Sequence, residues 1–325
     1  MIRIAGNLKP PRSLGRPVAT IGAFDGVHKG HQRVLAELRR WAGRLGTRSL
    51  VVTFDRNPKS LTRGERVPCI TSLEHRLVLL ERAGIDAAAV LRFDRRLRTM
   101  SARDFVVKIL CGKLRARGVL LGFNGRFGRN AEGDFALLRQ MEKDGVCEAR
   151  GCERPVRVEG ELVSSSAIRA AVEAGELRCA ERMLGRRVSV LGTVVHGRGV
   201  GRTLGFPTAN LDLHQEVKPP SAVYATEVCI AGRWMASVTS IGHRPTFSHP
   251  TREPVVEVLI PGLRRNLYGR DLEVRFIRRL REQIRFGSPE ELAAQIARDV
   301  EEVMRRQQAA AGEKKRRGQQ WVVSR

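Results

Sequence analysis

Two histidines, His28 and His31, stand three residues apart in a glycine-rich stretch near the amino terminus. The stretch follows an apolar run over 18–21 and precedes apolar residues at helical spacing, which predicts a strand, a tight turn and a helix. A helix N-terminus attracts phosphate through its unpaired N–H groups, and imidazole nitrogens donate hydrogen bonds to phosphate oxygens. The pattern therefore indicates chemistry at a phosphate group. The alternative is that both histidines are exposed residues without a role.

The turn reads G-A-F-D-G-V-H-K-G-H-Q from Gly22 to Gln32. Its glycines permit backbone angles and close approaches that a β-carbon would prevent. The string resembles the H-x-G-H signature of nucleotidyltransferases and, over its full length, that of the bacterial bifunctional riboflavin kinase/FMN adenylyltransferases, also called FAD synthetases. No P-loop pattern occurs in the chain. The resemblance implies that ATP is bound here by Gly22, Phe24, Asp25, Gly26, His28 and His31.

The length of 325 residues is enough for two domains that each bury a core. No uninterrupted apolar run approaches the roughly 18 residues that span a bilayer. Residues 1–16 also lack the apolar core of a signal peptide. The six cysteines contain no C-x-x-C pair. We therefore expect a cytoplasmic protein with reduced thiols and no membrane partner.

The formal net charge of +25 indicates anionic partners, either phosphorylated small molecules or nucleic acid. Nucleic-acid binding normally adds a known module or aromatic stacking platforms, and the aromatic content is only 5%. An arginine-rich genome composition would raise the charge without functional meaning. We expect small-molecule substrates and no nucleic acid, and keep a basic nucleic-acid-binding protein as an alternative. The sequence leaves self-association open.

Apolar runs alternate with helical patterns up to about residue 145. The expected strands cover 18–21, 49–54, 87–93 and 118–122, and the expected helices lie near 72–83 and 101–114. Both helices open with a capping-box pattern, Thr71…Glu74 and Ser101…Asp104. This alternation predicts an α/β domain with a doubly wound parallel sheet, similar to a Rossmann fold. Ligands of such sheets bind outside the carboxyl ends of the strands, where the two histidines fall.

Two other predicted strands also end in polar residues, T-F-D-R-N-P at 53–58 and G-F-N-G-R-F-G at 122–128. Ordinary turn residues would account for either segment. The family resemblance implies that Asn124 contacts the nucleotide. Two positions depart from the family pattern: Asn57 replaces its usual histidine, and Gly125 replaces its usual phenylalanine.

A run of hydroxyl side chains precedes a predicted helix in V-S-S-S-A-I-R at 163–169. Such a run forms a helix N-cap, and it can also bind phosphate with the help of the arginine one turn later. The segment resembles the family's I-S-S-T-x-I-R, with Ser166 in place of threonine. The resemblance implies that Ser165, Ser166 and Arg169 hold the β- and γ-phosphates of ATP.

After Gly185 the chain changes to short β-rich segments with frequent glycine and proline, which predicts a small β-barrel. We place an adenylyltransferase domain at 1–182, a riboflavin kinase barrel with a C-terminal helix at 183–305, and a disordered basic tail at 306–325. The C-terminal helix is expected to begin at Ser288. Its apolar face, expected to pack on the barrel, comprises Leu292, Ile296, Val300 and Val303.

The string L-G-F-P-T-A-N-L at 204–211 resembles the riboflavin kinase signature. A lone G-x-G at 199–201 lies outside a strand–turn–helix unit and is not a dinucleotide fingerprint, although glycine-rich backbone can wrap phosphates. Thr208 and Asn210 supply neutral oxygens that suit Mg²⁺ carried by ATP. The resemblance implies that ATP and flavin are bound by Gly197, Gly201, Thr203, Pro207, Thr208, Asn210 and Arg281.

Glu257 is an acid within the apolar strand segment V-V-E-V-L. An acid in such a segment is seldom there for packing, and phosphoryl transfer to a primary hydroxyl needs a group that accepts its proton. The alternative is an outward-facing carboxylate without a role. The resemblance implies that Glu257 is the catalytic base. Ala222 and Pro261-Gly262 depart from the family pattern nearby.

The resemblance as a whole implies a bifunctional enzyme. The second domain phosphorylates riboflavin to FMN with ATP and Mg²⁺, and the first transfers AMP from ATP to FMN, giving FAD and pyrophosphate. His28 and His31 are expected to stabilise charge at the α-phosphate, because positioning and electrostatics carry most of such a step. An alternative is a monofunctional riboflavin kinase whose first domain has decayed at residues 57, 125 and 166.

Overall fold

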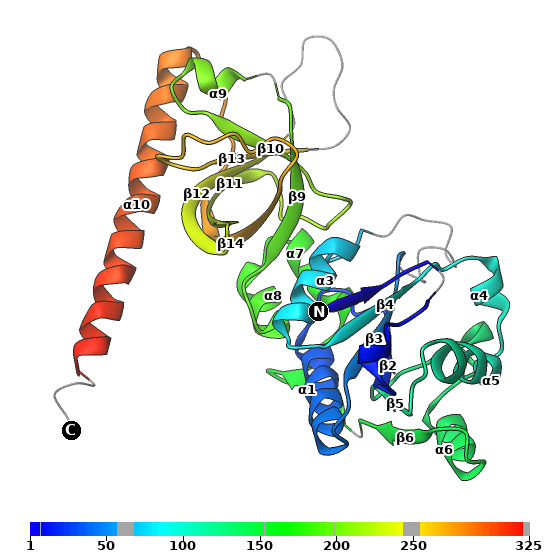
Figure 1. Cartoon of the computed structure of the whole chain (residues 1–325). Helices are drawn as coiled ribbons and strands as arrows, with labels where there is room; N and C mark the ends of the chain where they lie inside the picture. Colours follow the sequence, from blue (N-terminus) through cyan, green and yellow to red (C-terminus); the bar gives the residue numbers. More distant parts are fainter. Residues whose placement is uncertain (7, 57–67, 153, 198, 243–253, 321–325) are drawn as a thin grey trace. The chain divides into compact units, whose positions relative to one another are not determined.

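The computed structural model describes residues 1–325 apart from 7, 57–67, 153, 198, 243–253 and 321–325. The chain divides into two compact units (Figure 1). The first comprises Met1–Arg169 and Arg182–Gly185, and the second comprises Ala170–Glu181 and Arg186–Arg325. The chain therefore passes between the units more than once from Arg169 to Arg186, where the sequence analysis placed a single boundary near residue 182.

A six-stranded parallel sheet forms the centre of the first unit, in the order β1-β4-β3-β2-β5-β6. Its strands are β1 (Ile2–Ile4), β2 (Val18–Ile21), β3 (Ser49–Phe54), β4 (Ala87–Leu91), β5 (Gly118–Leu121) and β6 (Glu148–Gly151). The predicted doubly wound α/β fold is confirmed. The two edge strands were not predicted, because a three-residue strand and the sequence E-A-R-G carry no clear strand pattern.

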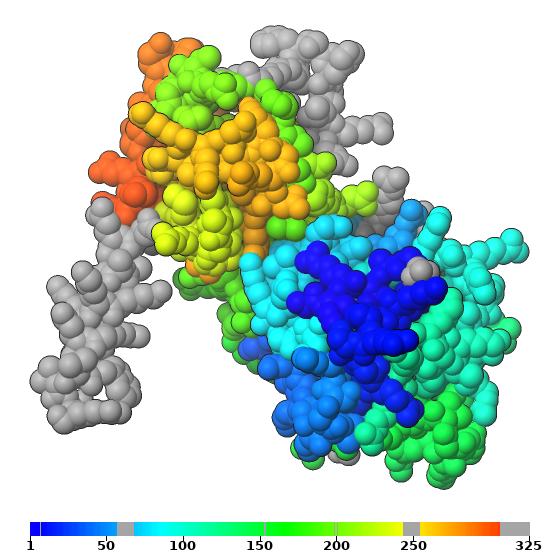
Figure 2. Space-filling model, viewed as in Figure 1, coloured from blue at the N-terminus to red at the C-terminus, as the bar shows by residue number. Residues whose placement is uncertain are grey.

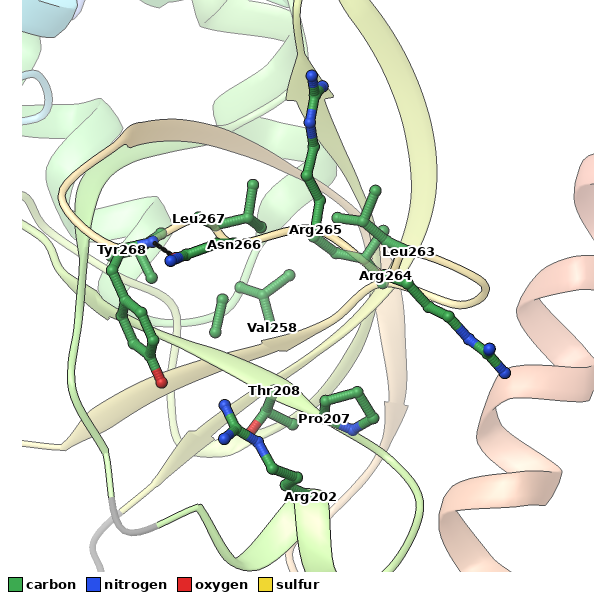
Figure 3. A pocket seen from close by; sticks show the side chains of 13 residues that line it. Arg202, Pro207, Thr208, Val258, Leu263, Arg264, Arg265, Asn266, Leu267 and Tyr268 are labelled. Carbon is green, nitrogen blue, oxygen red and sulfur yellow. Dashed lines mark hydrogen bonds between the residues drawn. The ribbon is translucent and has the colours of Figure 1, made fainter.

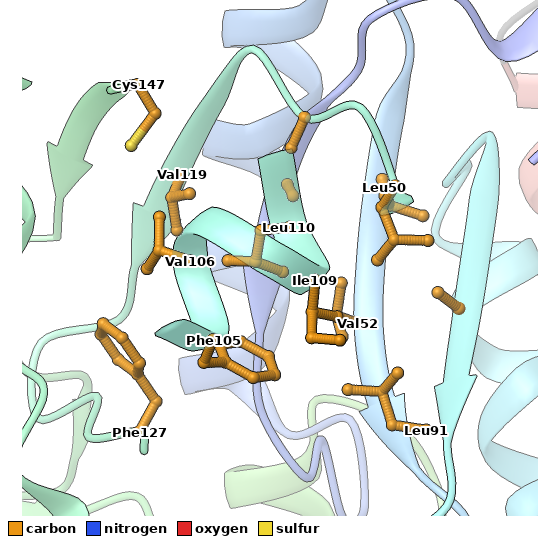
Figure 4. Close-up of a cluster of buried hydrophobic side chains, with 14 of the residues drawn as sticks. Leu50, Val52, Leu91, Phe105, Val106, Ile109, Leu110, Val119, Phe127 and Cys147 are labelled. Carbon is orange, nitrogen blue, oxygen red and sulfur yellow. The ribbon is translucent and has the colours of Figure 1, made fainter. Parts of the chain in front are cut away.

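Helices cover both faces of this sheet, and successive residues of β3 belong to different apolar clusters. α1 (Lys29–Arg44) and α3 (Leu73–Arg82) pack on one face, and the π-helix η2 (Phe105–Lys113) and α6 (Phe135–Lys143) pack on the other (Figure 4). The other described elements of the first unit are η1 (Arg12–Leu14), α4 (Arg95–Thr99), α5 (Ala102–Asp104), η3 (Arg129–Ala131), β7 (Arg157–Val158) and β8 (Glu161–Leu162). Two further helices, α7 (Ser165–Glu173) and α8 (Leu177–Leu184), contain residues of both units.

The two predicted capping boxes have different outcomes. The Ser101 hydroxyl accepts a hydrogen bond from the Asp104 N–H at 3.1 Å, as predicted. α3 begins one residue later than expected, because Ser72 rather than Thr71 is its N-cap and accepts from the His75 N–H at 3.3 Å. The Thr71 hydroxyl is instead engaged by the histidine-containing turn. After Asp104 the second predicted helix continues as η2, so it is α-helical only over its first turn.

The second unit is a closed antiparallel barrel in the order β10-β13-β12-β11-β14-β9. Because the barrel is closed, each of these six described strands is paired on both sides. Its strands are β9 (Ser189–Val195), β10 (Thr208–Asp212), β11 (Ala222–Ile230), β12 (Arg233–Gly242), β13 (Val255–Leu259) and β14 (Asp271–Arg281), and α9 (Val200–Thr203) precedes β10. The space-filling view shows the gold segment between β13 and β14 at the surface of this unit (Figure 2). The predicted barrel is confirmed.

The C-terminal helix α10 (Pro289–Gln320) packs on the outside of the barrel. Val303 is buried there, and Ile296 and Val300 contact the same cluster as predicted, whereas Leu292 is half-buried and outside it. The helical backbone of α10 extends to Gln320 and so includes residues 306–320, for which the sequence analysis expects a disordered tail. Alanine, glutamate, lysine, arginine and glutamine are strong helix formers, so this composition favours an extension of α10.

Candidate active sites

The turn between β2 and α1 has a strained backbone that the rest of the first unit holds in place. Phe24, Gly26 and Val27 have positive φ angles of 50°, 81° and 39°. Such angles are costly for residues with a β-carbon and are found where surrounding contacts enforce them. The Gly26 N–H donates to the Thr71 hydroxyl at 2.9 Å. This turn sets the direction in which the two histidines leave the backbone.

His28 and His31 lie together at the start of α1, as predicted. His28 is the N-cap, and its Nδ1 accepts from the His31 N–H at 3.4 Å. The two rings stack with their centroids 3.7 Å apart and their planes 17° from parallel. The Nδ1 atom of His31 is buried, and no residue that the structure describes forms a hydrogen bond with it. Burial lowers the pKa of His31 well below its ordinary value of 6.5, helped by His28 and Arg76, so its ring is neutral at pH 7.

Arg76 links β3 to the histidine turn, and the sequence analysis missed it. Its guanidinium donates to the Thr53 hydroxyl and to the Phe54 carbonyl, both at 3.0 Å. The Thr53 hydroxyl in turn donates to the Ala23 carbonyl at 3.2 Å. Arg76 is 3% exposed, within the apolar stripe of α3. An arginine at an apolar position of a helix was the signal that could have revealed it.

Asp25 and Arg169 form a buried ion pair behind this turn. Asp25 is 3% exposed and accepts from the N–H groups of Ile70 at 2.8 Å and Thr71 at 3.0 Å. Arg169 contacts its other carboxylate oxygen at 3.2 Å and donates to the Pro68 carbonyl at 2.8 Å. Burial raises the pKa of Asp25, and its hydrogen bonds and nearby arginines oppose this rise. The pair fastens α7 to the turn.

A cavity of about 450 Å³ opens in front of the histidines. Most residues predicted for the first site line it: Gly22, Phe24, His28, His31, Asn124, Ser165 and Ser166. Gly125 also lines it, whereas Asp25, Gly26 and Arg169 are not among its lining residues and Asn57 lies outside the described residues. Arg33 and Arg154 add positive charge that the sequence analysis missed. The cavity thus combines neutral imidazole, hydroxyl groups and guanidinium groups, which suits a nucleotide phosphate.

The second unit has a cavity of about 470 Å³ (Figure 3). Among the predicted residues, Pro207 and Thr208 line it, and Figure 3 shows the guanidinium of Arg202 beside the Thr208 side chain. The loop from Ile260 to Tyr268 forms the opposite wall. The side chains of Arg264 and Arg265 point away from Arg202 and Thr208 in this view. Arg202 and the loop residues were not predicted as site residues.

Glu257 and Asn210 are not among the lining residues of this cavity. Asn210 pairs with Glu257 across β10 and β13, and Ser240 pairs with Glu257 across β12 and β13. Directly opposite side chains share a face of the sheet. Val256 and Val258, on either side of Glu257, are both 1% exposed and point into the barrel. Glu257 is therefore an outward-facing, half-buried carboxylate with an amide beside it.

Gly197 and Gly201 allow close approaches that place these polar residues. A β-carbon on Gly197 would lie 2.1 Å from the Asn210 side-chain nitrogen. A β-carbon on Gly201 would lie 2.4 Å from the Phe206 carbonyl oxygen and 3.3 Å from the Thr208 side chain. Neither glycine is a lining residue of the cavity. The structure therefore shows that both glycines make room for neighbouring site residues, and their direct contact with ATP or flavin stays a prediction.

Arg281 and Thr203 are not brought to the cavity. Arg281 forms two hydrogen bonds of 3.1 Å and one of 2.7 Å with the carboxylate of Asp299 on α10. Asp299 is 5% exposed, so this bidentate pair fastens α10 to β14. Thr203 ends α9. Among the described residues, no group of three or more histidine, cysteine, aspartate and glutamate side chains is arranged to hold a metal ion.

Comparisons with known proteins support both halves of the chain. The family models for FAD synthetase and riboflavin kinase match residues 11–167 and 184–306. The bifunctional riboflavin kinase/FMN adenylyltransferase of Escherichia coli is 38% identical over 288 residues, which cover 87% of this chain and 90% of the relative. The chain belongs to this bifunctional family. The family member from Pseudomonas fluorescens is 37% identical over 302 residues, covering 92% of this chain and 95% of its own.

A solved structure extends the likeness to the whole fold. A protein described as a macrolide-efflux protein from Streptococcus pneumoniae matches with a TM-score of 0.73 and 28% identity, over 93% of this chain and 98% of that chain. Its description concerns export, whereas both family models concern flavin enzymes. Within the described part of the chain, no helix has the length and apolar character needed to cross a membrane.

Proposed function

We propose that the histidine cavity of the first unit performs adenylyl transfer and that the Glu257 face of the second performs phosphoryl transfer. The chain is a bifunctional flavin-cofactor enzyme: it phosphorylates riboflavin to FMN with ATP, and it joins the AMP part of ATP to FMN, giving FAD and pyrophosphate. The first assignment rests on the buried Nδ1 of His31 in the cavity wall, which has no hydrogen-bond partner among the described residues. The Asn210–Glu257 pairing carries the second.

In adenylyl transfer a phosphate oxygen of FMN attacks the α-phosphorus of ATP, and pyrophosphate leaves. Negative charge grows on the α-phosphate oxygens in the transition state. A neutral imidazole can donate one N–H to such an oxygen, and His28 and His31 are oriented together by their stacking. Ser165 and Ser166 in the cavity wall would bind the leaving phosphates. Because Arg169 is held by Asp25, its predicted contact with the phosphates requires it to exchange that partner.

In phosphoryl transfer the Glu257 carboxylate would accept the proton of the riboflavin 5′-hydroxyl as that oxygen attacks the γ-phosphorus of ATP. Thr208 and Asn210 are two residues apart on β10, so their side chains lie on the same side of this strand. Asn210 is the direct cross-strand partner of Glu257. These oxygens are of the hard type that suits Mg²⁺, so the residues fit the ion. Mg²⁺ bound with ATP would offset phosphate charge there. Thr208 also lines the adjacent cavity, which can accommodate part of a substrate.

We place both reactions in the cytoplasm. ATP is the phosphate and adenylyl donor in both steps, and all six cysteines are free in the structure. Free thiols fit a reducing compartment.

The test is a time course with purified protein, riboflavin, excess ATP and Mg²⁺, resolved by chromatography. FMN is expected first and FAD afterwards, and directly supplied FMN is expected to give FAD. A parallel reaction without Mg²⁺ should yield neither flavin. Accumulation of FMN without FAD, even from supplied FMN, would contradict the adenylyl-transfer assignment and favour a monofunctional kinase. Turnover unaffected by removal of Mg²⁺ would contradict the metal assignment.

A further inference from the structure

Two of the six cysteines, Cys111 and Cys147, lie side by side in the first unit. Cys111 is in η2 and Cys147 directly precedes β6, on the η2 and α6 side of the sheet. The Cys111 sulfur lies 4.0 Å from the carbonyl oxygen of Val146, the residue before Cys147. The two thiols lie close enough that each shifts the pKa of the other. Neither lines a cavity described above, and neither has a part in the proposed reactions.

The two thiols have different surroundings. Cys147 is 8% exposed and belongs to the apolar cluster shown in Figure 4, whereas Cys111 is half-buried at its margin. The hydrogen bond from Cys147 and the charge of Arg16 lower the pKa of Cys111. The same hydrogen bond and burial raise the pKa of Cys147. Cys111 is therefore the thiol that ionises first and reacts first with an oxidant, with Cys147 as its protonated neighbour.

We propose that Cys111 and Cys147 form an oxidation site that hydroperoxides convert into an intramolecular disulfide. The Cys111 thiolate attacks the O–O bond of hydrogen peroxide, forming a sulfenic acid while the departing oxygen takes up a proton and leaves as water. The Cys147 sulfur then attacks the Cys111 sulfur, and the sulfenic oxygen leaves as a second water molecule. Two thiols and one peroxide thus give one disulfide and two waters, and two electrons pass to the peroxide.

The geometry favours this partner over the other cysteines. A disulfide requires the two sulfurs to approach to about 2.05 Å, which only neighbouring side chains achieve without backbone rearrangement. Cys152, the other buried cysteine, contacts the Glu37 carboxylate at 3.7 Å instead of a thiol. Burial raises the pKa of Cys152 to about 11, so it stays protonated and unreactive at neutral pH. It is the natural internal control.

The test treats the full-length protein with hydrogen peroxide, denatures it, and labels remaining thiols with N-ethylmaleimide before mass spectrometry. Untreated protein is expected to take six labels, one for each cysteine. Treated protein is expected to take two fewer, to be about 2 Da lighter before labelling, and to yield a peptide cross-linked between Cys111 and Cys147. Dithiothreitol should restore all labels. Cys152→Ser, the matched control, should still lose two labels.

Variants separate this site from general oxidation. In Cys111→Ser and in Cys147→Ser, peroxide treatment should no longer remove two N-ethylmaleimide labels together. Cys111→Ser should also abolish the sulfenic acid that dimedone traps. Six labels after peroxide treatment would overturn the proposal. So would a cross-linked peptide containing any other cysteine, or irreversible oxidation of Cys111 with Cys147 still labelled. The mapping in wild-type protein is decisive even if a variant folds poorly.

Discussion

The two units collect their predicted site residues differently. In the first unit the H-x-G-H turn, Asn124 and the serines of α7 come from distant parts of the chain yet line one cavity. In the second unit the contiguous string Thr208-Ala209-Asn210 divides: Ala209 lines the cavity, and Asn210, the next residue, faces the other side of β10 with Glu257.

The geometry of each fold explains this difference. In a parallel sheet the carboxyl ends of all strands lie at one edge, so polar residues that follow successive strands converge. In a barrel, successive residues of one strand alternate between the inside and the outside. Proximity in sequence therefore predicts a shared site poorly on a strand, whereas equivalent positions after parallel strands predict it well.

Glu257→Gln should have the largest effect. The amide keeps the shape of the side chain but cannot accept the proton of the hydroxyl, so FMN formation should fall by about 10²- to 10⁴-fold. Conversion of supplied FMN to FAD should be unchanged, because that reaction belongs to the other unit. Separate chromatographic assays of the two steps measure this. Kinase activity close to wild type would mean that the outward face of β13 is not the phosphoryl-transfer site.

His31→Ala should show the converse pattern. Loss of one donor to the transition state should slow FAD formation on the order of 10²-fold, and His28→Ala should act similarly. Phosphorylation of riboflavin should continue at the wild-type rate, which also serves as the check on folding. If both variants make FAD normally, the stacked pair has only a capping role.

Asp299→Asn and Arg281→Ala test whether Arg281 binds substrate or fastens α10. The pair is mostly buried, with the Arg281 side chain 21% exposed, so breaking it should lower the free energy of unfolding by about 2 kcal/mol. Denaturant titrations of both variants should show a similar loss, because either change leaves the other partner without its opposite charge. A raised KM for ATP or riboflavin in Arg281→Ala alone would instead support the ligand-binding role predicted from the sequence.

Arg76→Met should change the titration of His31. The positive charge of Arg76 disfavours the imidazolium form, so its removal should raise the pKa of His31, and Arg76→Lys should change it less. Burial is the larger cause and remains in the variant, so the pKa should stay below 6.5. Nuclear magnetic resonance of isotope-labelled histidine measures the shift. An unchanged pKa of His31 in Arg76→Met would mean that Arg76 has no electrostatic effect on this histidine and only supports Thr53 and the turn through hydrogen bonds.

The smallest expected effect is on stability in mild acid. The folded pKa of His31 is depressed, so the unfolded chain takes up a proton near pH 6.5 that the folded chain does not. The contribution of His31 to the free energy of unfolding is fully present above about pH 6.5. It declines as the pH falls from there towards the pKa of His31 in the folded protein. His31→Gln, which cannot titrate, should show a weaker fall in the unfolding free energy between pH 7.5 and 5.5. An equal fall in both proteins would contradict this.

Much of the architecture followed from local patterns. The strand–turn–helix around His28, the alternation in the first unit and the short strands after Gly185 are periodic features that one stretch of chain carries by itself. The outcome at Ser72 is an exception with a clear reason. Thr71 could equally have capped α3, but its hydroxyl is engaged by Gly26, which lies far away in the sequence.

The sequence by itself determined the two fold classes, the phosphate-binding turn and the carboxylate within an apolar strand, because these depend on residue type and spacing within one segment. Only the tertiary structure decided that Asp25 and Arg76 brace the turn, that Arg281 is bound to Asp299, and that Cys111 meets Cys147. Each of these contacts joins residues that different elements bring together. Packing and burial select such partners, and local sequence periodicity carries no information about them.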